Sequence, residues 1–210
     1  SLFSTIRYRN IFPENQVVTW DQTGRFHSNQ YLTLHSAIYR TEIIRQSGIV
    51  LPKHIFYEDN LFVYAPLPLT KKLIYMNEDL YRYLIGREGQ SVSEKVMMKR
   101  CTHQIEIAQR IFDMHDLKVI LRENPKLGRY MYHEACFMLV IATVFTRLNR
   151  TEEAEQKVRD MWAHCMKTDP IIARKMRRNF LNLSVNLPGS FGRGIGLKGY
   201  WLAHKIVQFN

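Results

Sequence analysis

Two adjacent carboxylates lie in an apolar and aromatic surround in the stretch Leu51-Pro-Lys-His-Ile-Phe-Tyr-Glu-Asp-Asn-Leu-Phe62. Pro52 interrupts the preceding element, residues 55–57 have strand-forming side chains, and an apolar run resumes at Leu61. The stretch therefore predicts a strand-to-helix or loop-to-helix junction at Glu58-Asp59-Asn60. Charge in apolar surroundings costs free energy unless it is paired, so these carboxylates require an explanation.

Two explanations of the carboxylates are open. In the first, Asp59 or Asn60 caps a helix N-terminus by accepting a hydrogen bond from a backbone N–H group and meeting the positive end of the helix dipole. In the second, a carboxylate fixed at the start of a rigid helix, beside apolar side chains, takes a proton from a substrate hydroxyl as a general base. The two are compatible, because a capping position also orients the side chain.

The composition is that of a folded protein. The chain has 210 residues, of which 46% are apolar and 12% aromatic, enough for one core or two small domains. Cys101, Cys136 and Cys165 fall in segments with helical periodicity, which favours free thiols in a reducing compartment and hence a cytoplasmic protein. The longest uncharged apolar run, 135–146, is shorter than the roughly 20 residues of a membrane-spanning helix, so it predicts a buried helix.

The net charge of +11 is concentrated towards the C-terminus. Lys and Arg outnumber Asp and Glu by 10 to 8 in residues 1–92, by 12 to 10 in 93–166 and by 8 to 1 in 167–210. Such a concentration is typical of a surface that binds polyanions. Tyr200, Trp201 and Phe209 lie among the last of these cations, a mixture that suits an anionic membrane surface. A terminal helix docked on the helical core is the alternative.

Helical periodicity dominates after residue 92. Ser91-Val-Ser-Glu94 matches a capping box, and one helix is predicted from there to about Asp116 by the apolar stripe Met97, Cys101, Ile105, Ala108 and Phe112. Further helices are predicted over 116–123 and over 127–148. Thr151 is predicted to cap another helix, and Asp169 is predicted to cap a last one that has Pro170 at its first position and runs through about Leu183.

Strand-forming residues are concentrated before residue 92. They occupy segments 31–35, 72–75 and 80–85, in which Tyr75, Tyr81 and Tyr83 are interpreted mostly as packing residues. Gly48 is predicted to end a short helix. The sequence therefore predicts an α+β, mainly helical protein.

Four blocks occur in a fixed order: His35-Ser-Ala-Ile-Tyr-Arg-Thr-Glu-Ile-Ile44, Gly48-Ile-Val-Leu-Pro52, Tyr57-Glu-Asp-Asn-Leu-Phe62 and Tyr81-Arg-Tyr-Leu-Ile-Gly-Arg-Glu-Gly-Gln-Ser-Val92. Together they resemble the later part of bacterial family 2 glycosyltransferases, which build cell-surface polysaccharides. The resemblance implies that residues 1–92 are the acceptor-side portion of a GT-A catalytic domain with an α/β fold. A helical subdomain (93–183) and a basic, aromatic tail (184–210) would follow.

The resemblance also implies a reaction and its residues. A sugar would pass from a nucleotide-sugar to the hydroxyl of a glycan or lipid-linked acceptor, with inversion at the anomeric carbon. Asp59 would be the general base and Glu58 its neighbour in the motif, while Arg87, Gln90 and Ser91 would lie near the diphosphate of the donor. A solvated turn residue is the alternative for Arg87. The protein would be peripheral on the inner face of the membrane.

The chain departs from this family because it contains no Asp-x-Asp. The resembling enzymes hold a divalent metal, Mn²⁺ or Mg²⁺, and the nucleotide-sugar with that motif in the N-terminal half of their domain. We therefore expect the missing N-terminal half to be a partner of this chain, and we expect no turnover by this chain alone. No metal site is predicted in the chain itself, because the pairs His133/Cys136 and Cys101/His103 have no second pair at zinc-like spacing.

Two further hypotheses concern the C-terminal part. Gly194-Ile-Gly-Leu-Lys-Gly199 satisfies Gly-x-Gly-x-x-Gly, but too few residues follow it for a dinucleotide-binding unit. The alternative to a glycosyltransferase is a non-catalytic, basic helical module that binds an anionic membrane surface or nucleic acid through residues 167–210. Nucleic acid is not an expected partner under the glycosyltransferase hypothesis.

Overall fold

Helices make up most of the structure. The computed structural model describes residues 5–27, 30–84, 90–91 and 93–186, and 59% of them are helical, which confirms the mainly helical class. The α-helices are α1 (Thr41–Ser47), α2 (Asp59–Tyr64), α3 (Glu94–Lys99), α4 (Cys101–Met114), α5 (Leu117–Glu123), α6 (Pro125–Arg147), α7 (Glu152–Thr168), α8 (Pro170–Arg177) and α9 (Phe180–Val185). The shorter elements are the 3-10 helices η1 (Trp20–Gln22), η2 (Leu34–Ser36) and η3 (Leu67–Leu69) and the strands β1 (Val17–Val18) and β2 (Leu73–Ile74).

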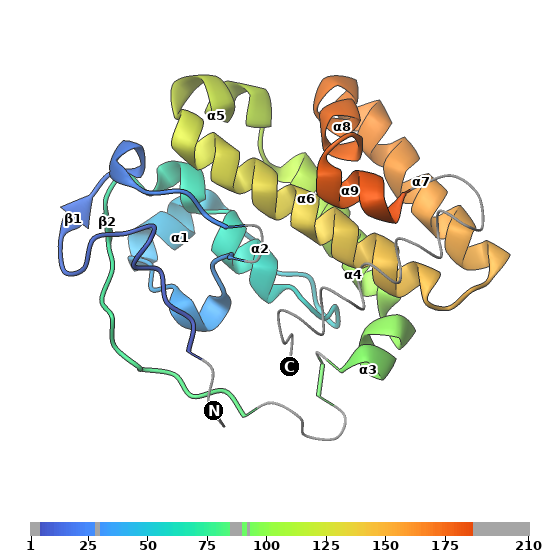
Figure 1. The fold of residues 1–210 in the computed structure, drawn as a ribbon, viewed down its shortest axis with the longest axis horizontal. Coiled ribbons are helices and arrows are strands. Elements are labelled where there is room, and N and C mark those ends of the chain that lie inside the picture. The colour runs from blue at the N-terminus through green and yellow to red at the C-terminus, as the bar shows by residue number, and fades with distance from the viewer. Residues whose placement is uncertain (1–4, 28–29, 85–89, 92, 187–210) are drawn as a thin grey trace.

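Helix α6 is the centre of the fold. It crosses the middle of the molecule and packs against α4, α5, α7 and α9 (Figure 1). Its side chains at Met131, Ala135, Leu139 and Ala142 have no exposed surface. A helix that is apolar around most of its circumference is stable only when other elements cover it, so the buried helix predicted over 135–146 is confirmed. None of the described helices is long and apolar enough to cross a membrane.

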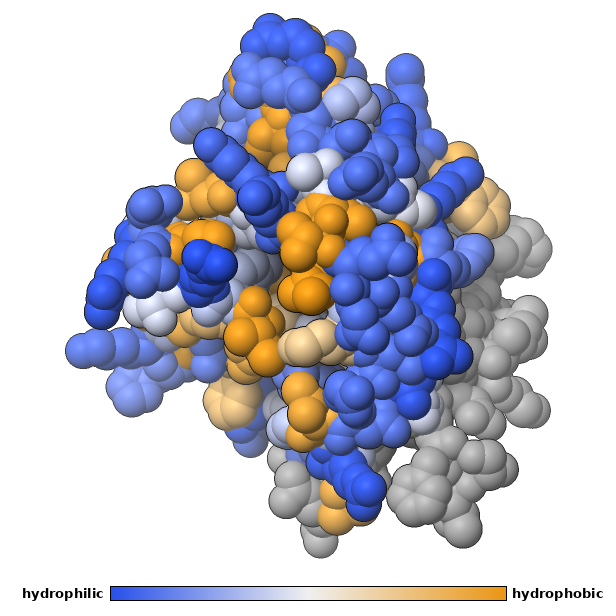
Figure 2. Space-filling view, turned by 90° about the vertical axis from the view of Figure 1, so that its left-hand side faces the viewer, coloured by the Kyte–Doolittle hydropathy of each residue, from blue (hydrophilic) through white to orange (hydrophobic). Residues whose placement is uncertain are grey.

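The N-terminal part consists of loops, short helices and a two-stranded antiparallel sheet. Strands β1 and β2 place Val17 opposite Ile74 and Val18 opposite Leu73, which confirms the strand predicted over 72–75. Val18 is buried, whereas Val17 and Ile74 are exposed. Figure 2 views this side of the molecule and shows apolar patches within a mostly hydrophilic surface.

One hydrophobic core joins the segments before and after residue 92. It includes Trp20 and Tyr64 from the first segment and Ile111 from the second. The Trp20 ring stacks on Tyr130 of α6, with ring centroids 5.9 Å apart and planes 13° apart. The division of the chain at residue 92 stays a prediction, and the described part of the chain on both sides of it contributes to the same core.

Three predicted helix starts are confirmed by capping hydrogen bonds. Asp116 accepts from backbone N–H groups at the start of α5, Thr151 does so for α7, and Asp169 does so for α8. Gly48 ends α1 in the left-handed conformation with φ of 65°, as predicted. The three cysteines are buried free thiols.

Two predicted helices are interrupted in the structure. The helix predicted from residue 94 to 116 is two helices, α3 and α4, which meet at Arg100. The helix predicted through about residue 183 ends at Arg177, and α9 begins after Asn179, whose side chain caps it by accepting from Leu181 N–H. The predicted capping box is wrong, because α3 begins after Ser93 rather than Ser91.

Two of the predicted strands are wrong. Residues 31–35 form no strand, because tyrosine side chains occupy their backbone groups: the Tyr8 hydroxyl donates to the Tyr31 carbonyl at 2.8 Å, and Leu32 N–H donates to the Tyr130 hydroxyl at 3.0 Å. Residues 80–84, the described part of the other segment, are also outside any strand. Leu80 is 74% exposed, so its strand-forming neighbours lack a core to pack against.

Candidate functional site

The Glu58-Asp59 pair lies where a loop enters helix α2. The helix is anchored by Leu61, Val63 and Tyr64, which are almost completely buried, and the Tyr64 hydroxyl donates to the Met131 carbonyl of α6 at 3.3 Å. The first turn of α2 is therefore fixed against the core while Asp59 remains exposed at its start. Of the two predicted junctions, the structure has the loop-to-helix form.

The prediction that Asp59 or Asn60 is the N-cap is wrong. The N-cap is Glu58, which has helical backbone angles and makes no capping hydrogen bond through its side chain. The Asn60 amide instead donates to the Tyr57 carbonyl at 3.0 Å and to the Asp59 carboxylate at 3.3 Å. Helix capping therefore does not account for Asp59.

The loop before α2 has an uncommon backbone conformation. His54 and Tyr57 have φ of 60° and 73°, values that non-glycine residues adopt only when the surroundings hold them there. Three contacts do so: Phe56 N–H donates to His103 Nδ1 at 3.1 Å, the Arg100 guanidinium lies 3.3 Å from the centre of the Phe56 ring, and the Tyr57 hydroxyl donates to the Ser91 carbonyl at 3.0 Å. Helix α4 and its start thus position the carboxylate pair.

The surroundings of Asp59 favour its neutral form. Neighbouring protein atoms partly desolvate the carboxylate and raise its pKa, and the negative charge of Glu58 raises the pKa further. The Asn60 backbone N–H and the His35 side chain act in the opposite direction. A carboxylate with a raised pKa is a stronger base than an ordinary aspartate when ionised, and Asp59 also keeps contact with solvent.

Three aromatic side chains form an open stack next to this segment. The His35 ring stacks on Tyr81 at 4.8 Å and on Tyr83 at 5.9 Å, and the two tyrosine rings stack on each other at 6.1 Å. His35 belongs to η2, which packs against α2, and the charge of Asp59 influences its pKa, which burial lowers overall. Tyr81 and Tyr83 are 55% and 40% exposed, so the interpretation of these two as packing residues is wrong. Tyr75, in contrast, packs against Tyr8 and Phe12.

The predicted donor-binding residues are only partly brought to the site. Ser91 is joined to the carboxylate loop through the Tyr57 hydroxyl, and the Gln90 amide donates to the Leu84 carbonyl at 3.1 Å. Arg87 lies outside the described residues. No group of three or more His, Cys, Asp or Glu within the described ranges could hold a metal ion.

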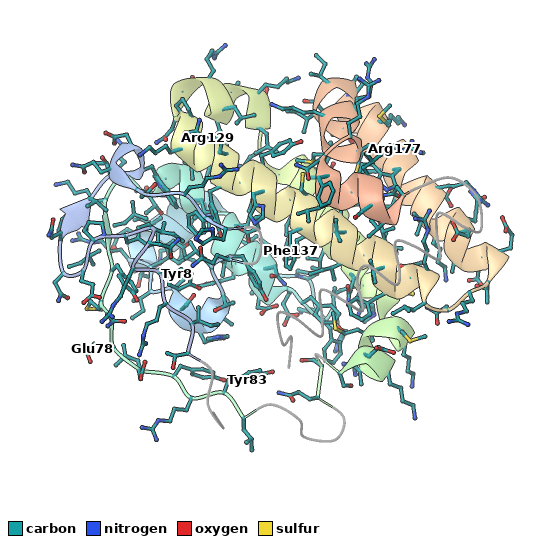
Figure 3. All side chains as sticks on the ribbon, viewed as in Figure 1. Tyr8, Glu78, Tyr83, Arg129, Phe137 and Arg177 are labelled. Atoms are coloured by element: carbon teal, nitrogen blue, oxygen red, sulfur yellow. The ribbon has the colours of Figure 1, made fainter. Side chains whose placement is uncertain are left out.

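The sequence did not predict a role in the site for His35, Tyr81 or Tyr83. All three belong to the blocks quoted above, and the alternation of Tyr81 and Tyr83 would place both on one side of an extended chain. Their stacking on His35 depends on tertiary structure, because 45 or more residues separate them in the sequence. Figure 3 places Tyr83 on the extended segment at the lower edge, away from Arg177 on α8.

An open hollow of about 700 Å³ lies elsewhere on the surface and is lined by residues of α6, α8 and the start of α9. Neither Asp59 nor the aromatic stack contributes to it. None of the protein-family models, curated proteins or solved structures that were compared with the chain matches it.

Proposed function

We propose that this chain is the C-terminal portion of an inverting glycosyltransferase in cell-surface polysaccharide synthesis, with residues 1–92 as the acceptor side of its catalytic domain. One observation carries the proposal: the exposed Asp59 carboxylate, with a raised pKa, lies at the fixed start of α2 and interacts electrostatically with His35, on which the exposed rings of Tyr81 and Tyr83 stack. The faces of aromatic rings pack well against the carbon-bound hydrogens of a sugar ring. A sugar held on the stack would bring a hydroxyl group towards the carboxylate.

The proposed reaction uses Asp59 as the base. The ionised carboxylate takes the proton of the acceptor hydroxyl as its oxygen attacks the anomeric carbon of the donor sugar. A new C–O bond forms on one face of that carbon while the bond to the nucleotide diphosphate breaks on the other, so the configuration inverts. Glu58 raises the pKa of Asp59 by charge repulsion and so increases its basicity.

In this proposal, partners of the chain supply the donor sugar and the protein segment that binds it. The resemblance implies a nucleotide-sugar donor, a glycan or lipid-linked acceptor and a donor-binding half with Asp-x-Asp and Mn²⁺ or Mg²⁺. The exposed apolar pair Val17 and Ile74 supports contact with another protein surface, because apolar patches of this kind are frequent at interfaces. Arg87, Gln90 and Ser91 keep their proposed place near the diphosphate.

Replacement of Asp59 by Asn tests the proposal. In the intact enzyme, Asp59→Asn keeps the size of the side chain and removes its basicity, so we expect the transfer rate to fall roughly 100- to 10,000-fold, with little change in KM. The measurement is transfer from a panel of labelled nucleotide-sugars, with circular dichroism to verify folding. Asp160→Asn, which changes an exposed carboxylate on α7, is the matched control. A near-normal rate for Asp59→Asn would contradict the proposal.

A second candidate function is a basic helical module that binds an anionic membrane surface or nucleic acid. The basic side chains of α8 favour it, since Arg174, Lys175 and Arg177 lie in its last turn. The rest of the predicted binding segment, 187–210, lies outside the described residues. Binding to oligonucleotides and liposomes across a salt series distinguishes the two functions, because affinity that falls steeply with salt indicates phosphate contacts.

A further inference from the structure

The hollow between α6, α8 and the start of α9 combines cationic and apolar walls. Its lining residues are Tyr132, Ile171, Arg174, Lys175, Arg178 and Asn179. Ile171 is 61% exposed and provides an apolar rim. The ammonium group of Lys175 lies 5.3 Å from the centre of the Tyr132 ring, which places a charge beside an aromatic surface.

Among the residues that the structure describes, no carboxylate forms an ion pair with the cations of this hollow, Arg174, Lys175 and Arg178. Asp169 is the only acidic residue between 167 and 210 in the sequence. It is occupied elsewhere, because it caps α8 and pairs with Lys118 of α5 at 2.9 Å.

The guanidinium of Arg174 is held in place without a carboxylate. Its Nε donates to the Pro170 carbonyl at 2.8 Å, which restrains the side chain along the helix without using its terminal amino groups. Fixed arginine groups bind phosphate oxygens well, because their N–H groups match the spacing of two oxygens. Lysine adds a compact charge to the same phosphate group.

A purely structural role is the competing explanation for these cations. Positive side chains in the last turn of a helix stabilise its negative end, and α8 has three of them. Arg177 shares that last turn but does not line the hollow; it lies 6.0 Å from the centre of the Trp162 ring. The two explanations therefore differ in what they predict for Arg174 and Arg177.

We propose that this hollow is a binding site for a phosphate group whose attached molecule has an apolar part. Arg174, Lys175 and Arg178 hold the phosphate oxygens, while the Tyr132 ring and Ile171 contact the apolar part. The phosphate belongs to a lipid headgroup or to a free phosphorylated molecule, since both present the same chemistry. The site is independent of glycosyl transfer at Asp59.

Two probes and a matched pair of variants test the site. The probes are inorganic pyrophosphate, followed by calorimetry and by NMR of the arginine side chains, and phosphatidylcholine vesicles with or without phosphatidic acid. Arg174→Gln/Arg178→Gln removes two cations from the hollow. Lys167→Gln/Arg177→Gln removes two nearby exposed cations that do not line it and has the same net charge.

We expect the hollow variant to lose at least roughly tenfold in affinity, as removal of charge-assisted hydrogen bonds predicts, while the matched variant stays close to the parent. Pyrophosphate binding at Arg174 identifies a free phosphorylated molecule. Vesicle binding that requires phosphatidic acid and is weakened in the hollow variant, without measurable binding of free pyrophosphate, identifies a lipid headgroup.

Three results would overturn the proposal. The first is that neither probe binds, and the second is that both variants lose the same affinity. The third is that an oligonucleotide binds in place of pyrophosphate with a steep salt dependence, which indicates a surface for polyanions instead. Asp59→Asn should leave all of these affinities unchanged, so the outcome is separate from that of the proposed glycosyl transfer.

Discussion

At the scale of single residues, the carboxylates of Asp59 and Glu134 share a raised pKa and differ in their access to solvent. Asp59 is exposed at the start of α2, where its proton can be exchanged with a substrate. Glu134 is completely buried in α6. Burial raises its pKa to about 8, although the Tyr130 hydroxyl lowers the pKa to a smaller extent. The first arrangement is suited to chemistry, and the second makes stability depend on pH.

The repulsion between Glu58 and Asp59 predicts a shift in pH dependence. Glu58→Gln removes a charge that raises the pKa of Asp59, so the rise of transfer rate with pH, which follows ionisation of the base, should move to lower pH. NMR titration of the Asp59 carboxyl carbon in this chain measures the same pKa without catalysis. Glu42→Gln on α1 is the control and should leave both curves in place. An unmoved curve in Glu58→Gln would show that the pair is not coupled.

The burial of Glu134 predicts a loss of stability with rising pH. The pKa of Glu134 in the folded protein, about 8, is above its ordinary value of 4.5. The protonated Glu134 therefore contributes fully to stability below about pH 4.5, and this contribution is lost as the pH rises through 8. The free energy of unfolding should fall by a few kcal/mol over this range. Glu134→Gln should remove this part of the pH dependence in urea unfolding, because an amide does not ionise.

The exposed Glu123 provides the comparison for that experiment. Glu123→Gln should unfold with the pH dependence of the parent. If Glu134→Gln did the same, the buried carboxyl would not control stability.

At the scale of elements, the close approach of α5 to α6 depends on a glycine. A Cβ atom at Gly128 would lie 2.6 Å from the Leu121 Cα and 2.8 Å from its backbone nitrogen, so the two helices would have to separate. We expect Gly128→Ala to reduce the free energy of unfolding by about 1–3 kcal/mol through overpacking, despite the better helix propensity of Ala. Chemical denaturation measures the change.

Arg129, the next residue on α6, is exposed (Figure 3). Arg129→Ala in the same helix should therefore change stability by much less than Gly128→Ala. A Gly128→Ala protein that is more stable than the parent would mean that α5 is free to move away from α6.

The elements also show where local sequence is informative. Thr151 and Asp169 are predicted as caps and act as caps, because a capping hydrogen bond joins residues two or three apart. Asp116 is predicted only as the start of a helix, and its side chain also caps that helix. The interruption at Arg100 is not predicted from the apolar stripe, and it coincides with a contact to Phe56, 44 residues away. The prediction of a strand over 31–35 is also wrong because of distant contacts. Backbone groups of this segment form hydrogen bonds with tyrosine hydroxyls from other parts of the chain.

At the scale of the whole molecule, the shared core predicts one cooperative unfolding transition. Trp20 lies in the first part of the chain and Trp162 in α7, and both belong to the same buried cluster. In a Trp201→Phe background, each variant that keeps only one of these two tryptophans should therefore show the same urea midpoint by tryptophan fluorescence and by far-UV circular dichroism. Two separate midpoints would show that the chain divides into independent units near residue 92.

The sequence by itself determined the mainly helical class, the central buried helix, two helix caps and the position of Asp59 at a helix start. These features follow from contacts between residues close in the chain and from the period of apolar side chains. Only the tertiary structure decided that Asp59 interacts with His35, that Tyr81 and Tyr83 stack on His35, that Glu134 is buried, and that cations of α8 meet Tyr132 of α6 in a hollow. Such contacts depend on how distant segments pack, and a local pattern of side chains does not specify which of its distant neighbours it will meet.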